Sequence, residues 1–234
     1  MKLDILAIGA HPDDVELGCS ATLAKAIAEG KKVGILDLTQ GELGSRGTAE
    51  TRKEEAKAAA KILGVKVREN LQLSDGFFQN NKDNQLAIVK IIRQYQPDIV
   101  LSNPPTDRHP DHGKAAELVS NALFLSGLIK IDTQQEAWRP KKHFHYIQWL
   151  PIEPTFLVDV SGYLDIKVEA CMAYKTQFYN PNLEDEPQTA ISSKNFTDSI
   201  RYRALDLGRL IGVEAAEGFV ACRYIGIQSL DDLI

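Results

Sequence analysis

The sequence predicts an α/β fold of the Rossmann-like, doubly wound type, with a mainly parallel sheet, helices on both faces and a single domain. Short apolar runs alternate with longer segments of helical spacing through the first 125 residues. Gly30, Gly64 and Pro97 end three of the helical segments, as expected of residues that stop helices. The chain has 234 residues, of which 44% are apolar, so it is long enough for one well-buried α/β domain and short for two.

The first 125 residues form the regular βα core of this prediction. Strands are expected at 3–9, 33–38, 65–73 and 98–102, where apolar and β-branched residues run together. Helices are expected at 16–29, 51–64, 85–95 and 113–125. The second of these helices opens with the capping-box spacing from Thr51 to Glu54. A glycine-rich loop at 39–47 separates the second strand from that helix.

Residues 126–234 are expected to complete the sheet and to supply substrate-selecting loops. Strands are predicted at 144–150, 156–160 and 218–224, and helices at 163–176 and 199–211. Because no repeat, low-complexity tract or linker divides the chain, residues 1–234 are predicted to form one domain.

Charge and cysteine content exclude several classes of function. The net charge of −5 provides no basic field for nucleic acid or an anionic membrane. Cys19, Cys171 and Cys222 are far apart and odd in number, which favours reduced thiols over a disulfide framework. No secretory or membrane-spanning segment is evident. We therefore expect a cytoplasmic protein that binds neither nucleic acid nor membrane.

Two His/Asp clusters each follow one of the predicted strands. They read His11-Pro12-Asp13-Asp14 and His109-Pro110-Asp111-His112. If the two strands are neighbours in a parallel sheet, both turns open onto one crevice at its carboxyl end. Two imidazoles and one carboxylate that meet there would form an open, three-ligand metal site.

Such a site can activate water for hydrolysis. With His11, Asp14 and His112 as ligands, a coordination position remains for water, whose pKa zinc lowers to about 7. Asp13 could take the proton of that water and pass it to a leaving amine. The spacing alone does not say which of Asp13 and Asp14 is the ligand, and either could instead cap the following helix.

The second cluster also contains side chains that are not metal ligands and could stabilise the transition state. His109 could stabilise an oxyanion, with Asp111 or Asp107 holding its other ring nitrogen in one tautomer. Arg52 follows the glycine-rich loop and is either a first-turn helix residue or a substrate contact.

Other interpretations compete with hydrolysis. Two histidines and one carboxylate also suit a non-haem Fe(II) oxygenase. A nucleotide-binding module without catalysis would use the first turn, but that turn lacks the Gly-x-Gly-x-x-Gly arrangement. His143 and His145 alternate along a predicted strand without a nearby acidic residue, which favours sheet-surface residues over ligands.

With these residues in view, the chain resembles the PIG-L or LmbE-like family of zinc-dependent deacetylases. The resemblance runs along most of the chain and weakens after Asp132. It rests on the paired motifs that begin at Gly9 and His109, on two segments between them and on a later helix. These segments are Gly9-Ala10-His11-Pro12-Asp13-Asp14, Thr39-Gln40-Gly41-Glu42, Arg52-Lys53-Glu54-Glu55, His109-Pro110-Asp111-His112 and residues 167–177.

The resemblance implies a Rossmann-like fold and removal of the N-acetyl group from an N-acetylglucosamine unit. Carried over by motif, the metal ligands would be His11, Asp14 and His112, and the general base would be Asp13. His109 would stabilise the tetrahedral intermediate, and Arg52 would bind sugar hydroxyls.

Within the family, the chain looks most like the bacillithiol-pathway enzymes that deacetylate N-acetylglucosaminyl-malate. Similar proteins act on N-acetylglucosamine or chitooligosaccharides, and some assemble as hexamers made from trimers, so we expect a homo-oligomer. Malate carries two carboxylates and needs a cation beside the site, for which Arg108 is the candidate. The expected cofactor is Zn²⁺, although Fe²⁺ also suits these ligands.

Overall fold

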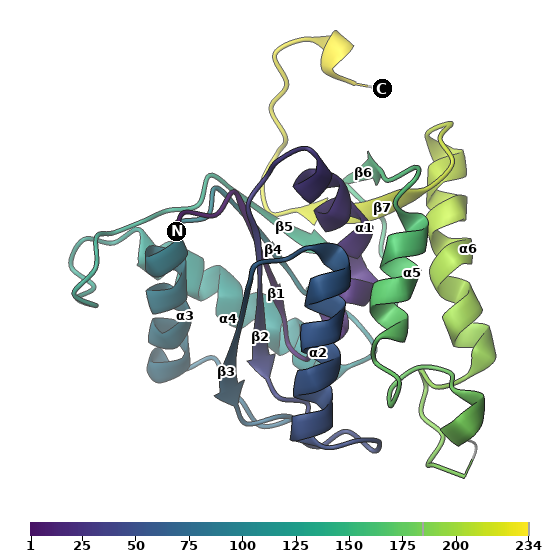
Figure 1. The fold of residues 1–234 in the computed structure, drawn as a ribbon. Coiled ribbons are helices and arrows are strands. Elements are labelled where there is room, and N and C mark those ends of the chain that lie inside the picture. Colours follow the sequence, from purple (N-terminus) through teal and green to yellow (C-terminus); the bar gives the residue numbers. More distant parts are fainter. Residues whose placement is uncertain (184, 234) are drawn as a thin grey trace.

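A seven-stranded sheet forms the centre of the molecule in a computed structural model that describes residues 1–183 and 185–233. The strand order is β3-β2-β1-β4-β5-β7-β6 (Figure 1). Neighbours among the first five strands are parallel, and β7 is antiparallel to both of its neighbours. The strands are β1 (Ile5–Gly9), β2 (Val33–Thr39), β3 (Val67–Leu73), β4 (Ile99–Ser102), β5 (Lys142–Tyr146), β6 (Phe156–Asp159) and β7 (Ala216–Ala221).

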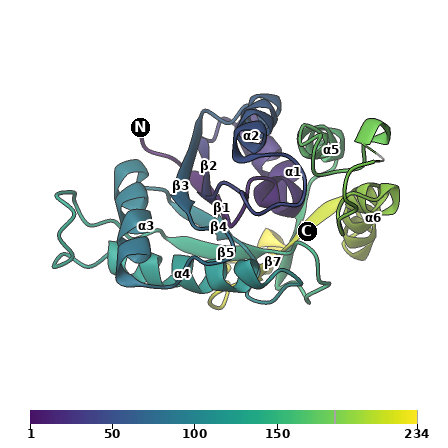
Figure 2. The same cartoon turned by 90° about the horizontal axis from the view of Figure 1, so that it is seen from below.

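Helices cover both faces of this sheet. Figure 2 shows α3 and α4 on one face, and α1, α2 and α5 on the other, with α6 beside α5. The helices are α1 (Asp14–Ala28), α2 (Ala49–Leu63), α3 (Lys82–Tyr95), α4 (Pro110–Ser126), α5 (Leu164–Met172) and α6 (Lys194–Leu210). None of the described helices combines the length and apolar character needed to cross a bilayer. The predicted single-domain, doubly wound fold is confirmed.

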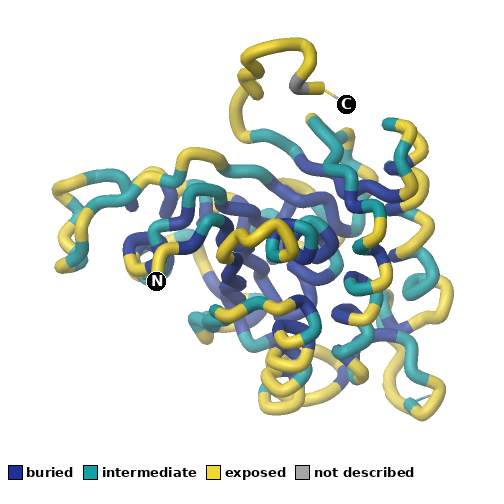
Figure 3. Tube along the Cα trace, turned by 45° about the horizontal axis from the view of Figure 1, so that its top comes forward, coloured by how far each residue is buried: buried dark blue, intermediate teal, exposed yellow. Residues whose placement is uncertain are grey.

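The core consists of one apolar layer on each side of the sheet. Along β1, Leu6 and Ile8 pack toward α3 and α4, whereas Ile5 and Ala7 pack toward α1. Every residue of β1 and β2 is buried, as expected of strands covered on both faces (Figure 3). Each fully buried leucine or isoleucine contributes about 1.5–3 kcal/mol, so β1 and β2 are firmly packed supports for the turns that follow them.

Several predicted boundaries are wrong, and hydrogen bonds explain two of them. Helix α2 begins at Ala49 because the capping box lies at Thr48 and Thr51, not at Thr51 and Glu54. Helix α6 begins five residues earlier than predicted because Ser193 accepts a hydrogen bond from the third helical amide.

Further boundaries also differ. Helix α5 ends at Met172, and β5 and β7 each begin two residues before the predicted strands. Strand β5 ends at Tyr146, so Gln148 leaves the sheet and reaches the functional site described below.

The strand order reverses between β1 and β4. These strands pair directly, with Ile5 opposite Ile99 and Ala7 opposite Leu101. Helices α1 and α4 then leave toward opposite faces of the sheet (Figure 2), and a cavity lies where the two strands end. The two His/Asp clusters follow these strand ends.

Candidate metal centre and active site

The two clusters converge although about a hundred residues separate them in the chain. The ring centroids of His11 and His112 are 5.9 Å apart, and that of His109 lies 4.7 Å from His11 and 5.2 Å from His112. The three imidazoles therefore surround one small space at the strand ends.

Asp14 lies between the two proposed histidine ligands. Its Oδ1 is 3.2 Å from His112 Nε2, and its Oδ2 is 3.6 Å from His11 Nδ1. Gln148 Nε2 donates to Oδ1 at 2.6 Å, and Asn103 Nδ2 donates to Oδ2 at 3.0 Å. Burial alone would raise the pKa of Asp14, but the neighbouring histidines hold it well below its usual range, so the carboxylate is anionic.

The outer nitrogen of each histidine contacts a second carboxylate. Asp75 Oδ1 lies 3.0 Å from His11 Nε2, and Asp107 Oδ2 lies 2.6 Å from His112 Nδ1. Burial lowers the pKa of His112, but the charge of Asp14 and the hydrogen bond to Asp107 raise it to about 9. Metal-binding histidines commonly have this arrangement, in which an outer carboxylate orients the ring and the inner nitrogen faces the ion.

The donor set therefore fits a divalent cation. We call the predicted ligands His11, Asp14 and His112 the metal centre; two imidazoles and a carboxylate with one open position are a ligand set of catalytic zinc. Two groups that share His11 bring their ligand atoms within 4.8 Å of one another, namely His11, His109 and His112, and His11, Asp75 and Asp111; Asp14 is in neither group. The short contacts of Asp14 with His11 Nδ1 and His112 Nε2 nevertheless favour His11, Asp14 and His112 as the ligands.

Asp13 occupies an unusual position beside the metal centre. It precedes α1 with a backbone φ of 104°, and its side chain makes no capping hydrogen bond. Its carboxylate is 5% exposed and accepts from Arg52 Nη2 at 3.1 Å. Burial raises the pKa of Asp13 to about 7, with Arg52 opposing and Asp14 adding to the shift. A carboxyl group with this pKa can take up and release a proton near neutrality.

The Arg52 side chain is buried and bonded to the protein, unlike an arginine that only contacts substrate. Besides its bond to Asp13, its guanidinium donates to the carbonyl of Pro12 and lies 6.0 Å from the Tyr174 ring centroid. The side chain nevertheless lines the cavity described below. It therefore holds the first turn in place and also faces the substrate space.

His109 is poised to donate a hydrogen bond. It precedes α4, and its Nδ1 accepts from the backbone N–H of Asp111 at 3.3 Å. The neutral ring then carries its proton on Nε2. Burial lowers the pKa of His109, and the nearby His11 and His112 lower it further, which keeps the ring neutral.

We expected Asp111 or Asp107 to hold the second ring nitrogen of His109, but both carboxylates bond to other groups. Asp107 bonds to His112 instead. Asp111 accepts from Gly76 N at 2.8 Å and from Lys114 Nζ at 3.0 Å, and its Oδ2 is 3.5 Å from His11 Nε2. The physical reason is that the Asp111 carboxylate is already held by the Gly76 amide and the Lys114 ammonium.

A cavity of about 470 Å³ opens above the metal centre. Its walls include Asp13, Arg52, His109 and the glycine-rich loop, together with Gln148 and residues 188–191. This volume is typical of small-molecule sites.

The mouth of the cavity is positively charged and aromatic. The Arg108 guanidinium lies 4.7 Å from the Trp149 ring centroid, and Trp149 stacks on Phe196 at 4.9 Å. All three residues line the cavity, and Arg108 is exposed. The arginine is therefore held where it can meet an anionic part of a substrate.

Sequence reasoning missed three residues that hold the ligands. Asn103 and Gln148 fix Asp14, and Asp75 fixes His11. Asn103 directly follows a predicted strand, which was a usable signal. Asp75 and Gln148 belong to no motif, and only the folded chain brings them to the site.

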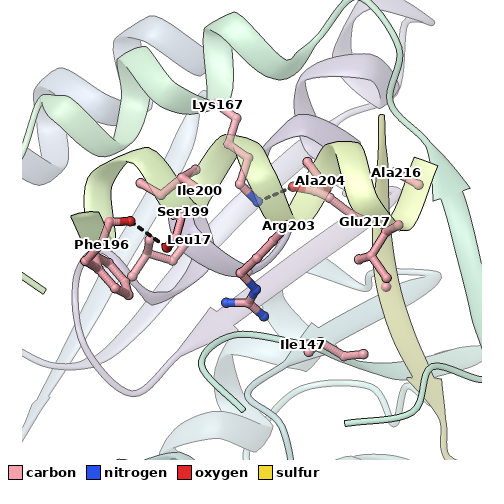
Figure 4. A pocket seen from close by; sticks show the side chains of 13 residues that line it. Leu17, Ile147, Lys167, Phe196, Ser199, Ile200, Arg203, Ala204, Ala216 and Glu217 are labelled. Carbon is pink, nitrogen blue, oxygen red and sulfur yellow. Dashed lines mark hydrogen bonds and ion pairs between the residues drawn. The ribbon is translucent and has the colours of Figure 1, made fainter. Parts of the chain in front are cut away.

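A second, smaller cavity of about 40 Å³ lies between α6, α1 and β7 (Figure 4). Lys167 there forms an ion pair with Glu217, whose carboxylate also accepts from the amides of Ala21 and Thr22. These hydrogen bonds give partners to two backbone amides of α1, next to Cys19, where the helix departs from helical geometry. The space holds a few water molecules and is far smaller than the cavity above the metal centre.

Comparison with known proteins identifies the family. The family model described as GlcNAc-PI de-N-acetylase, PIG-L, matches residues 6–123, just over half of the chain. The chain belongs to the PIG-L family. The matched segment contains both His/Asp clusters and Arg52, so the predicted family is confirmed.

Individual relatives of this PIG-L protein include deacetylases. Diacetylchitobiose deacetylase of Thermococcus kodakarensis is 30% identical over 190 residues, which cover 74% of this chain and 70% of the relative. The crystal structure of the conserved protein TT1542 from Thermus thermophilus is 36% identical, with a TM-score of 0.86 and coverage of 97% of this chain and 98% of that one. A 4-oxalmesaconate hydratase of Pseudomonas putida is 24% identical over 96% of this chain and 88% of its own. The family and the first relative support N-deacetylation.

Proposed function

We propose that this PIG-L protein is a zinc-dependent N-deacetylase that removes the acetyl group from an N-acetylglucosaminyl conjugate. The observation that carries the proposal is Asp14, held between the inward nitrogens of His11 and His112, with the raised-pKa carboxyl of Asp13 beside it. Metal-assisted amide hydrolysis uses this combination of a cation site and a separate base.

The residues around the metal centre have distinct roles in this proposal. A divalent cation would supply Lewis-acid activation of water and of the amide carbonyl. Asp13 takes the proton from the attacking water and returns it to the departing amine. His109 directs its Nε2–H toward the developing oxyanion. Arg52 positions Asp13 and faces the sugar.

The substrate we favour is N-acetylglucosaminyl-malate. The cavity accommodates a sugar, and Arg108 at its mouth offers a guanidinium to a carboxylate of the aglycone. A relative that acts on diacetylchitobiose favours the second candidate, a neutral chitooligosaccharide. The two substrates differ in the charge that they would bring to Arg108: the malate conjugate carries carboxylates, and the chitooligosaccharide is neutral.

The hydratase relative defines a further candidate activity. This relative is 24% identical along nearly the whole chain, and it is named for a hydration reaction. Hydrolysis is favoured here because the family model and the 30% identical relative are both named for deacetylation. The same names favour hydrolysis over an Fe(II) oxygenase or a nucleotide-binding module.

An amine-release assay tests the proposal directly. Purified protein of measured metal content is incubated with N-acetylglucosaminyl-malate, N-acetylglucosamine and diacetylchitobiose. We expect zinc-dependent release of free amine, fastest with the malate conjugate. Absence of amine release from all three substrates by the zinc-loaded protein would contradict deacetylation, whereas a preference for diacetylchitobiose would contradict only the malate assignment.

A further inference from the structure

A second group of ligand-type side chains lies where β5 meets β7. His143 and His145 belong to β5, and Cys222 directly follows β7. Each residue offers a ligand atom within 4.8 Å of the others. None of the three lines the active-site cavity. We call these residues the His–Cys cluster.

The antiparallel register explains why the three side chains meet. Phe144 pairs with Ala221, which places Cys222 opposite His143. Side chains alternate along a strand, so both histidines lie on the face opposite Phe144. The Sγ of Cys222 is 3.2 Å from His143 Nδ1, and the two imidazole centroids are 4.7 Å apart.

Hydrogen bonds leave one nitrogen of each imidazole available as a ligand. The backbone carbonyl of Asn103 lies 2.7 Å from His145 Nδ1, so that nitrogen carries the proton and the lone pair lies on Nε2. Ser102 Oγ lies 2.8 Å from His143 Nε2 and can accept its proton, which leaves the Nδ1 lone pair toward Cys222. Metal-bound histidines have their outer nitrogen bonded in this way.

The protonation states of the cluster also suit a cation. Burial lowers the pKa of His143 to about 3, and it lowers the pKa of His145 as well, so both rings are neutral. Cys222 is exposed as a residue, but partial burial of its thiol raises the pKa of that group to about 11, so an incoming cation must displace the thiol proton.

We propose that His143, His145 and Cys222 form a second metal site for a borderline-soft divalent cation of the zinc type. Zn–S and Zn–N bonds of about 2.3 and 2.0 Å place sulfur and nitrogen about 3.6 Å apart in a tetrahedral site, so the Cys222–His143 contact opens by a few tenths of an ångström. The exposed position of Cys222 leaves the fourth coordination position to solvent. The ion would tie β5 to the end of β7, from which the C-terminal segment leaves the body of the molecule (Figure 1).

Cobalt titration of the full chain loaded with only one zinc ion per chain, at the metal centre, tests this site, because a second equivalent of zinc would fill it and block cobalt. Cys19 and Cys171 are fully buried, so a thiolate-to-cobalt charge-transfer band reports Cys222. We expect the band to saturate at one cobalt ion per chain. The variant C222S should lose the band and this ion while it keeps the zinc of the metal centre.

Matched variants exclude other origins of the signal. S102A, which removes the partner of His143, should weaken cobalt binding about 10–100-fold. H112A should lose the zinc of the metal centre and keep the band. No band in the wild-type protein, or an unchanged band in H143A, would overturn the second site, and neither result bears on the deacetylase proposal.

Discussion

The metal centre and the His–Cys cluster each bring two imidazoles together, but among the described residues only the first has carboxylates around it. Asp14 lies between its histidines, and Asp75 and Asp107 bond to their outer nitrogens. The second group has a hydroxyl and a backbone carbonyl in the equivalent positions. Histidine pKa values are consequently raised in the first group and lowered in the second.

This difference teaches that the carboxylates make the metal centre suited to a hard divalent cation. Anionic ligands stabilise a divalent cation before substrate arrives and leave Asp13 as a spare base. The His–Cys cluster has neutral nitrogens and a thiol, a donor set that favours softer ions. The two groups can therefore be tested separately in the same protein.

The largest expected effect comes from removing one histidine from each group. His112→Ala should strip the ion of the metal centre and lower deacetylation at least about 10⁴-fold, because the pKa of bound water is no longer lowered from 15.7 toward 7. Metal analysis and amine release measure the two effects. The matched variant His143→Ala should leave deacetylation near the wild-type rate. Full metal content in the His112 variant would contradict its role as a ligand.

A smaller effect should follow from changing the base without changing the ligands. Asp13→Asn should keep the bound ion and lower kcat about 10²–10⁴-fold, since the amide cannot accept the proton of water. Metal content and kcat are measured on the same preparation. If the ion and the activity are lost together, Asp13 is a ligand and not the base.

The outer carboxylates offer a finer comparison. Asp107→Asn should weaken metal binding about 10–100-fold, because it removes the charge that orients His112 and increases its basicity. Titration with a competing chelator gives the affinity. An unchanged affinity would show that the outer carboxylates of the metal centre are dispensable.

The effect at the cavity mouth should depend on the substrate. Arg108→Ala should raise KM for N-acetylglucosaminyl-malate about tenfold, as expected for loss of a partly exposed charged hydrogen bond. KM for N-acetylglucosamine should change little, because that substrate lacks the carboxylates. Equal changes for both substrates would dismiss the contact.

The sequence predicted the parts of the fold and site that depend on local patterns. Alternating apolar segments indicated the parallel sheet, and two clusters after corresponding strands indicated a shared crevice, which the pairing of Ala7 with Leu101 explains. Asp75 and Gln148 could not be assigned, because their contacts with His11 and Asp14 depend on loops that have no periodic signal.

The contact between Cys222 and His143 also could not be predicted from the sequence. It depends on the register between β5 and β7, and both strands begin earlier than their patterns indicate. A shift of one residue in that register would place the thiol on the other face of the sheet.

The left-handed backbone at Asp13 has a consequence for how this enzyme can be improved. A residue other than glycine pays a conformational penalty at a φ of 104°, and burial of a carboxyl group opposes folding as well. Asp13→Gly would relieve both costs but would leave the buried Arg52 guanidinium without its carboxylate partner, which opposes any gain in the free energy of unfolding. A search for a hardier variant should therefore leave Asp13 in place and look for gains away from this turn.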